Sequence, residues 1–130
     1  MSTMRAVILA FAASLLTSGA RAGDWRVYHN DRFGVTADAP ADWITDPPPA
    51  NNDGQVFVSP DKRARLTISG ILVISPREED FASLLAPNDG ETVTYKKRGS
   101  ASVIVSGIKG DRIFYRKSIL SCRGGIWNDI

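Results

Sequence analysis

The only histidine of the chain, His29, is the residue best suited by type to acid–base chemistry. A histidine titrates near neutral pH, so it can accept a proton from a nucleophile or bind a metal. One imidazole cannot build a cluster of histidine ligands, however, and no motif places a nucleophile beside it. We therefore predict a surface histidine next to a turn, and we assign no catalytic, metal-binding or cofactor-binding residue. A small hydrolase that uses His29 with Ser or Asp side chains remains an alternative.

The only cysteine, Cys122, limits the thiol chemistry of the chain. A single thiol cannot form an internal disulfide, so the stability of the fold must come from a packed core. Cys122 follows the apolar pair Ile119–Leu120, where a small hydrophobic side chain fits. We expect Cys122 to be buried, and pairing with another chain is the alternative.

Three consecutive acidic residues, Glu78, Glu79 and Asp80, could be taken for a catalytic carboxylate group. A simpler explanation is that they lie at the beginning of a helix, where the positive end of the helix dipole favours carboxylates. Ser75 and Glu78 form the S-x-x-E pattern of a capping box. The apolar residues that follow have helical spacing, which predicts one short amphipathic helix over Pro76–Ala86.

The first 22 residues have the features of a cleaved signal peptide. Arg5 is followed by an apolar run of eleven residues, Ala6–Leu16, and small residues stand at both positions that a signal peptidase reads in Ala20–Ala22. The apolar run is shorter than the roughly 20 residues that span a bilayer. We expect cleavage between Ala22 and Gly23. This leaves a single domain over 23–130, in the periplasm or secreted, without a membrane span.

The charge of the exported chain gives no support for a nucleic-acid partner. Cleavage removes Arg5 and Arg21 from the 16 basic residues, which leaves 14 against 14 acidic ones. A protein that binds nucleic acid or anionic lipid usually has a net positive charge. The strongest basic run, Lys96–Arg98, ends a predicted strand, where like charges protect a sheet edge from unwanted pairing.

Alternating apolar and polar residues predict a largely antiparallel sheet built from hairpins. Successive strands with no crossover helix between them favour antiparallel pairing. The stretch Phe33–Trp43 is central to this pattern, because Pro40 ends a strand and the turn after it delivers Trp43 to the core. The fold class is thus α+β, with the helix on one sheet face. The predicted strands are Trp25–Asn30, Val35–Ala39, Gln55–Ser59, Arg65–Ile74, Thr92–Arg98, Ser100–Ile108 and Arg112–Leu120.

Two segments carry more specific expectations. Ile44–Gly54 contains three prolines and an N-N-D-G run, so we predict a surface loop. A calcium loop and a proline-rich ligand for another protein remain alternatives for this segment. Ile71–Ile74 is apolar at every position, which predicts that this end of its strand lies at the centre of the sheet or beneath a helix.

The pattern Y-x-x-x-x-F-G-V-x-x-x-x-P-A-D-W over Tyr28–Trp43, followed by Phe57–Asp61 and Arg65–Ile68, resembles the PsbP-like fold. This family includes an extrinsic protein of the oxygen-evolving photosystem, a Ran-binding nuclear-transport factor and small exported bacterial domains. The resemblance implies an antiparallel sheet flanked by helices and a non-enzymatic, protein-binding role, with no catalytic residue. It also implies a further strand, a proline-containing loop and a final helix after Asn128–Ile130. We therefore expect the domain to be incomplete at its C-terminus.

These observations favour an exported, non-catalytic binding or accessory domain, with a protein partner or self-association. A cell-wall or carbohydrate-binding module is the alternative. It rests on Trp25, Trp43 and Trp127, whose rings could stack on sugars, although tryptophans of a small domain are more often part of its core. We expect Trp43 to be buried. One helix over five or more strands is also expected to leave an apolar sheet face open.

Overall fold

The computed structural model describes residues 23–121 and 124–130. The predicted signal peptide, which ends at Ala22, and the buried position expected for Cys122 therefore lie outside the described residues. Within the described part, every strand pairing is antiparallel and one short helix is present. The predicted α+β class is confirmed at this level. The incompleteness expected after Ile130 stays a prediction.

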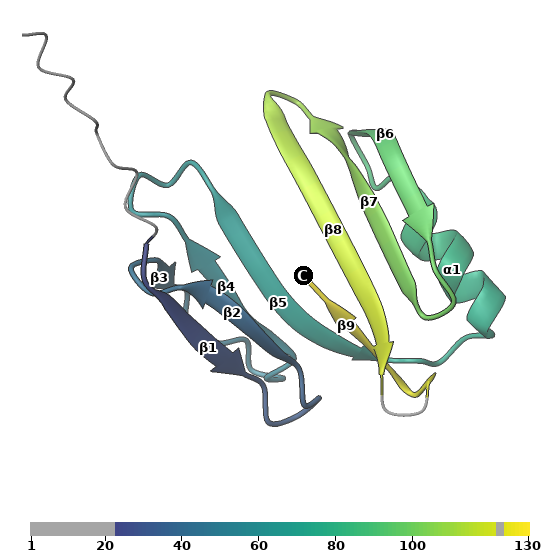
Figure 1. The fold of residues 1–130 in the computed structure, drawn as a ribbon, viewed down its shortest axis with the longest axis horizontal. Helices are drawn as coiled ribbons and strands as arrows, with labels where there is room; N and C mark the ends of the chain where they lie inside the picture. The colour runs from purple at the N-terminus through teal and green to yellow at the C-terminus, as the bar shows by residue number, and fades with distance from the viewer. Residues whose placement is uncertain (1–22, 122–123) are drawn as a thin grey trace, which may run out of the picture.

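The main sheet has seven strands in the order β3-β4-β5-β9-β8-β7-β6 (Figure 1). Strands that follow one another mostly pair as hairpins, but the last strand, β9, inserts between β5 and β8. Because β9 is antiparallel to both neighbours, β5 and β8 run parallel to each other. The bounds are β3 Ile44–Thr45, β4 Gly54–Val58, β5 Arg65–Leu72, β6 Glu91–Arg98, β7 Ser102–Lys109, β8 Arg112–Ser121 and β9 Ile126–Asp129.

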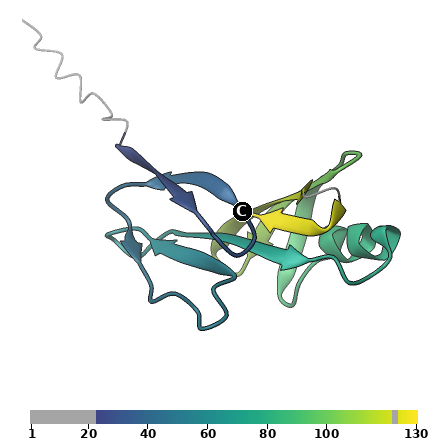
Figure 2. The same ribbon diagram turned by 90° about the horizontal axis from the view of Figure 1, so that it is seen from below.

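A separate hairpin, β1 (Trp25–His29) with β2 (Thr36–Pro40), covers one face of the sheet beside β4 and β5 (Figure 2). Its turn is held by the buried side chain of Asn30, whose Oδ1 accepts a hydrogen bond of 2.9 Å from the Phe33 backbone N–H. The alternation predicted for β2 is confirmed, since its inward residues meet the sheet in a first core. This first core consists of Val35, Ala39, Phe57 and Ile68.

The described helix, α1 (Arg77–Leu85), packs over β7 and β6 on the opposite face of the sheet. Residues that pair across β5, β9, β8 and β7 point to the same face of the sheet, whereas successive residues of one strand point to alternate faces. By this register Val103 and Ile68 point to opposite faces. The second core lies between α1 and the sheet. It consists of Phe81, Val103, Val105 and Trp127.

The predicted beginning of the helix needs correction. The N-cap residue is Pro76 rather than Ser75, and no side-chain hydrogen bond caps the helix. Glu78, the other half of the expected capping box, instead binds Arg98 of β6 at 2.7 Å. A contact with a neighbouring strand has replaced the local cap that the sequence pattern favours.

Strand β6 forms one edge of the sheet, as the basic run Lys96–Arg98 predicts. Simple alternation would put Val93 and Tyr95 on the same face, but a bulge shifts the register between them. Val93 therefore packs on the second core, whereas Tyr95 is 52% exposed on the other face.

Two predicted segments differ from the structure. Ile44–Gly54 is not all loop, because Ile44–Thr45 pairs with β4 as the short strand β3 and Gly54 begins β4. The apolar end of β5 lies inside the sheet, as one alternative predicted, because Ile71 and Leu72 pair with β9. It is not covered by a helix, however, since both residues are more than half exposed. The helix that could have covered them packs over β7 and β6 instead.

The face opposite α1 is open over β7 and β8, as expected from a single helical cover. Apolar side chains from both strands point to this face and remain exposed to solvent: Ile108, Ile113, Tyr115 and Ile119. Among the described residues, no helix is long and apolar enough to cross a membrane.

Candidate binding site

Two cavities lie where strands β5 and β8 separate beyond the end of β9. Arg65, Leu66, Tyr115 and Ile130 line both cavities, and we name the region defined by these residues the β5–β8 gap. The helix-side cavity extends to α1 and has a volume of about 480 Å³. The hairpin-side cavity extends to the β1–β2 hairpin and has a volume of about 1070 Å³. The end of the described chain lies between β5 and β8 (Figure 1).

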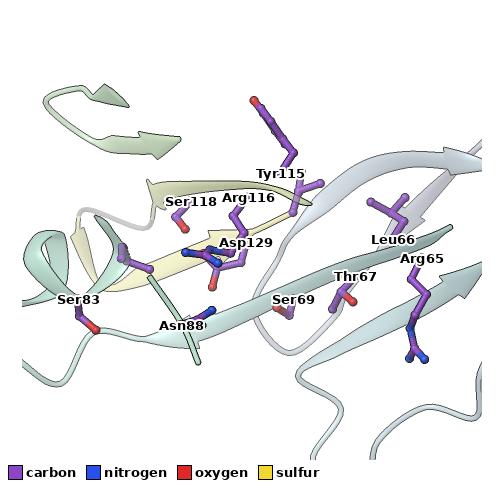
Figure 3. A pocket seen from close by; sticks show the side chains of 12 residues that line it. Arg65, Leu66, Thr67, Ser69, Ser83, Asn88, Tyr115, Arg116, Ser118 and Asp129 are labelled. Carbon is purple, nitrogen blue, oxygen red and sulfur yellow. The ribbon is translucent and has the colours of Figure 1, made fainter. Parts of the chain in front are cut away.

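Arg116 of β8 lines the helix-side cavity (Figure 3). It is fixed by an ion pair with Glu91 of β6. Its Nη1 donates to the Glu91 carboxylate oxygens at 2.6 and 2.5 Å, and its Nη2 donates to the Ala86 carbonyl at 3.2 Å. Burial by itself raises the pKa of Glu91. Hydrogen bonds from Arg116 and from the Asn88 backbone N–H outweigh burial, so the pKa of Glu91 lies below its usual range. Arg116 is therefore held in the cavity wall as the cation of an ion pair.

Asp129 of β9 has a buried carboxylate oxygen without a partner. Its Oδ1 accepts no hydrogen bond from the part of the chain that the structure describes. Burial raises the pKa of Asp129, and a hydrogen bond from Ser118 and the charge of Arg116 only partly oppose this. The three side chains lie together in the helix-side cavity (Figure 3). Since an unsatisfied buried acceptor costs stability, a donor that enters this cavity gains a hydrogen bond at little cost.

The hairpin-side cavity combines aromatic rings with a positive rim. Trp25 and Tyr115 line it from different elements, and they are 64% and 58% exposed. Trp43 adds a further ring. The charged lining residues are Arg63, Arg65, Lys109, Arg112, Asp38 and Asp111, an excess of two positive charges. Exposed aromatic rings beside cations suit a ligand that is partly apolar and partly acidic.

His29 lines neither cavity and lies at the turn end of the β1–β2 hairpin. Its Nδ1 is 2.8 Å from Thr36 Oγ1, and its Nε2 is 3.5 Å from Asp31 Oδ1. The side chain is about half exposed, so the predicted surface position beside a turn is confirmed. The structure does not bring His29 together with a serine in either cavity.

The acidic residues at the beginning of α1 make contacts within the fold. Glu78 binds Arg98, and this hydrogen bond is the main reason why the pKa of Glu78 is lowered. Asp80 Oδ2 accepts a hydrogen bond of 3.0 Å from Trp127 Nε1. All three acidic residues lie in the first turn of α1, as predicted, but two of them also connect the helix to the sheet.

The three tryptophans have three different environments. Trp127 is 2% exposed and belongs to the second core. Trp43 is half-buried, because it packs against the first core and also lines the hairpin-side cavity. Trp25 is mostly exposed in the same cavity. The prediction that Trp43 is buried is therefore only half right, and two of the three candidate sugar-stacking rings lie in one cavity.

Sequence reasoning missed Tyr115, Arg116 and Asp129 as site residues. The sequence did contain one signal for Arg116, which alternation places on the same face as Phe114 and Ser118, where a charge needs a partner. Nothing in the sequence could place Asp129, because its neighbours depend on the insertion of β9 between two strands that are distant in the chain.

Within residues 23–121 and 124–130, no group of three or more His, Cys, Asp or Glu side chains could hold a metal ion. No family model, no curated protein and no solved structure matches this chain. The geometry of the β5–β8 gap is therefore the basis for a functional proposal.

Proposed function

We propose that this chain is an exported, non-catalytic binding domain that captures an extended segment of a partner protein in the β5–β8 gap. The observation that carries the proposal is the meeting of two cavities at Arg65, Leu66, Tyr115 and Ile130. Peptide-binding sites combine apolar pockets for anchoring side chains with a few polar groups that orient the backbone. The gap offers both, with aromatic rings on the hairpin side and Arg116 and polar side chains on the helix side.

Three features of the sequence and the surface support this function. Residues 1–22 resemble a signal peptide, which favours the periplasm or the outside of the cell. The resemblance to the PsbP-like fold, which we retain as part of the proposal, favours a protein partner over a catalytic role. The open apolar face with Ile108, Ile113 and Ile119 offers a second contact surface, either for the partner or for self-association.

A pair of matched variants tests the proposed site. Tyr115 and Tyr95 both pair with Ser106, from the two strands that flank it, and so they point to the same face of the sheet. The two side chains are 58% and 52% exposed, but only Tyr115 lines the gap. A displayed library of short peptides is selected on the purified chain. We expect Tyr115→Ser to weaken binding of the selected peptides by at least about tenfold, and Tyr95→Ser to leave it unchanged. Failure to select any peptide, or equal effects of both variants, would contradict the proposal.

A carbohydrate-binding function is the second candidate, because Trp25 and Trp43 lie in one cavity and Trp25 is 64% exposed. Sugar rings stack on exposed tryptophan faces. Sedimentation with purified peptidoglycan separates the two functions. Under the carbohydrate function the chain sediments with peptidoglycan, and Trp25→Ala abolishes this. Under the peptide-binding function the chain stays in the supernatant.

A further inference from the structure

Strand β1 has a described neighbour on one side only, because the β1–β2 hairpin forms a two-stranded sheet of its own. It lies at the outside of the molecule (Figure 1). Three of its five side chains are exposed on the face that points away from the first core: Trp25 (64%), Val27 (69%) and His29 (53%). The free edge of β1 thus carries an exposed and mostly apolar row of side chains.

The backbone groups at this edge can be identified from the pairing with β2. The Asn30 N–H donates to the Val35 carbonyl at 2.9 Å, so Asn30 bonds towards β2. In an antiparallel ladder the N–H and C=O groups of successive residues point to alternate sides. The N–H and C=O groups of Trp25, Val27 and His29 therefore point away from β2, along the free edge.

The other edges of the two sheets carry features that discourage pairing with another strand, whereas β1 does not. Strand β6 has a bulge and the basic run Lys96–Arg98, and β3 has two residues and is soon followed by Pro47–Pro49. Strand β2 ends in Pro40. The register of β1 is unbroken, and the strand contains neither proline nor lysine. An exposed apolar edge without such protection is a template for strand pairing.

We propose that β1 pairs with β1 of a second copy of this chain, antiparallel about a twofold axis at Val27. In this register Val27 bonds to Val27 of the second copy, and Trp25 bonds to His29 of the second copy. All the outward backbone groups of the three residues are then paired, whereas a shift of two residues would leave one residue without a partner in β1. The inference does not depend on peptide binding in the β5–β8 gap.

The side chains that meet in this register are compatible. Residues directly opposite each other share a face, so Trp25 meets His29, Val27 meets Val27, and Arg26 meets Tyr28 of the second copy. No two like charges lie directly opposite each other, and the β-branched and aromatic side chains suit cross-strand contacts. Because the strand is complementary to itself, a second copy fits it without any further partner.

Arg26 is the residue of β1 that could oppose pairing, since a charge on an edge strand needs a partner. Its guanidinium already lies 5.2 Å from the centre of the Phe57 ring, and its Nη2 donates to the Trp43 carbonyl at 3.2 Å. The Tyr28 ring of the second copy adds an aromatic face beside it. Pairing therefore leaves Arg26 with its contacts. The result is a four-stranded sheet, β2-β1-β1-β2, in place of two hairpins, each of which is a marginal unit by itself.

Sedimentation velocity of the purified chain over a range of concentrations tests this inference. We expect a dimer that forms as the concentration rises. Val27→Lys places two lysines opposite each other at the twofold axis, so it should raise the dissociation constant of the dimer at least about tenfold. A mixture of Val27→Lys and Val27→Glu should restore the dimer, because the opposed charges then attract. Tyr95→Lys, at an exposed position of the β6 edge, is the matched control and should dimerise like the wild type.

Hydrogen exchange identifies the strand that pairs. The amides of Trp25, Val27 and His29 should exchange more slowly as the dimer forms. A chain that stays monomeric at every concentration would overturn the inference, as would a dimer that Val27→Lys does not weaken or a charge-paired mixture that fails to associate. Slow exchange of these three amides in the monomer would also overturn it, since another part of the chain would then cover the edge of β1.

Discussion

The indole Nε1 of Trp127 donates a hydrogen bond of 3.0 Å to Asp80 Oδ2, which ties the central strand β9 to helix α1. The same ring meets Phe81 edge to face, with the ring centroids 5.3 Å apart and the planes at 84°. Asp80 and Phe81 are neighbours in α1, so one side chain of β9 fixes the helix by a polar and an aromatic contact. The short strand that borders the gap is thereby connected to the helix.

Trp127→Ala should destabilise the fold severely. Truncation of a buried aromatic ring costs about 3–5 kcal/mol, which is a large share of the stability of a small domain. The measurement is urea unfolding followed by circular dichroism. Trp127→Phe is the matched control: it keeps a ring in the second core but loses the hydrogen bond to Asp80, so it should lie between the wild type and the alanine variant. An alanine variant as stable as the wild type would contradict the assigned core.

Glu91→Gln should lower stability at neutral pH by about 1.5–3 kcal/mol, the range for hydrogen bonds to charged groups. The pKa of Glu91 is lowered in the folded state. The contribution of Glu91 to the stability of the fold is therefore present above its unfolded pKa, about 4.3, and is lost as the pH falls through its folded pKa. The deficit of the variant should therefore shrink in acid. Unfolding at a series of pH values measures it, with the exposed Glu79→Gln as the control. A deficit that does not depend on pH would refute the role of this ion pair.

Asp129→Asn should have the opposite pH dependence. The pKa of Asp129 is raised by burial, so this group favours the fold below its unfolded pKa, about 3.9, and this advantage is lost as the pH rises through the folded pKa. A permanently neutral side chain of the same shape should be more stable at neutral pH by about 1 kcal/mol, the lower end of the cost of an unsatisfied buried polar group. Thermal melting at neutral and acidic pH checks this. A variant that melts lower at neutral pH would show that the carboxylate stabilises the fold.

Gly107→Ala should weaken the pairing of β6 with β7. A Cβ atom at Gly107 would lie 2.0 Å from the Thr92 carbonyl oxygen. A backbone atom cannot move aside as easily as the end of a flexible side chain. Overpacking of this kind costs about 1–3 kcal/mol, more than the gain from a less flexible unfolded chain. The measurement is the urea midpoint, with the neighbouring Ser106→Ala as the control on the other face. Equal midpoints for the two variants would mean that the close approach is relieved at no cost.

The local elements could be predicted from the sequence because their causes are local. The β7–β8 hairpin is marked by alternation on both sides of Gly110, which has a φ of 62° in the turn. The helix is marked by its apolar spacing and by the acidic residues of its first turn. Even the edge position of β6 follows from the basic run Lys96–Arg98.

The candidate site could not be predicted because it depends on long-range pairing. Whether β9 lies at an edge or in the centre of the sheet is decided by its neighbours, and these are β5 and β8. The cavity residues Arg65 and Tyr115 are brought together only by this insertion. The N-cap was misassigned for a related reason, since Arg98 of a later strand competes for Glu78.

The three indole N–H signals provide the most direct test of the β5–β8 gap as a binding surface. Trp25 and Trp43 line the hairpin-side cavity, whereas Trp127 is buried in the second core and serves as an internal control. A peptide selected from the displayed library is titrated into the purified, isotope-labelled chain, and the indole signals are followed by two-dimensional NMR. We predict that the signals of Trp25 and Trp43 shift and that the signal of Trp127 stays in place. If the signals of Trp25 and Trp43 stay unchanged while the peptide binds, the gap is not the binding site.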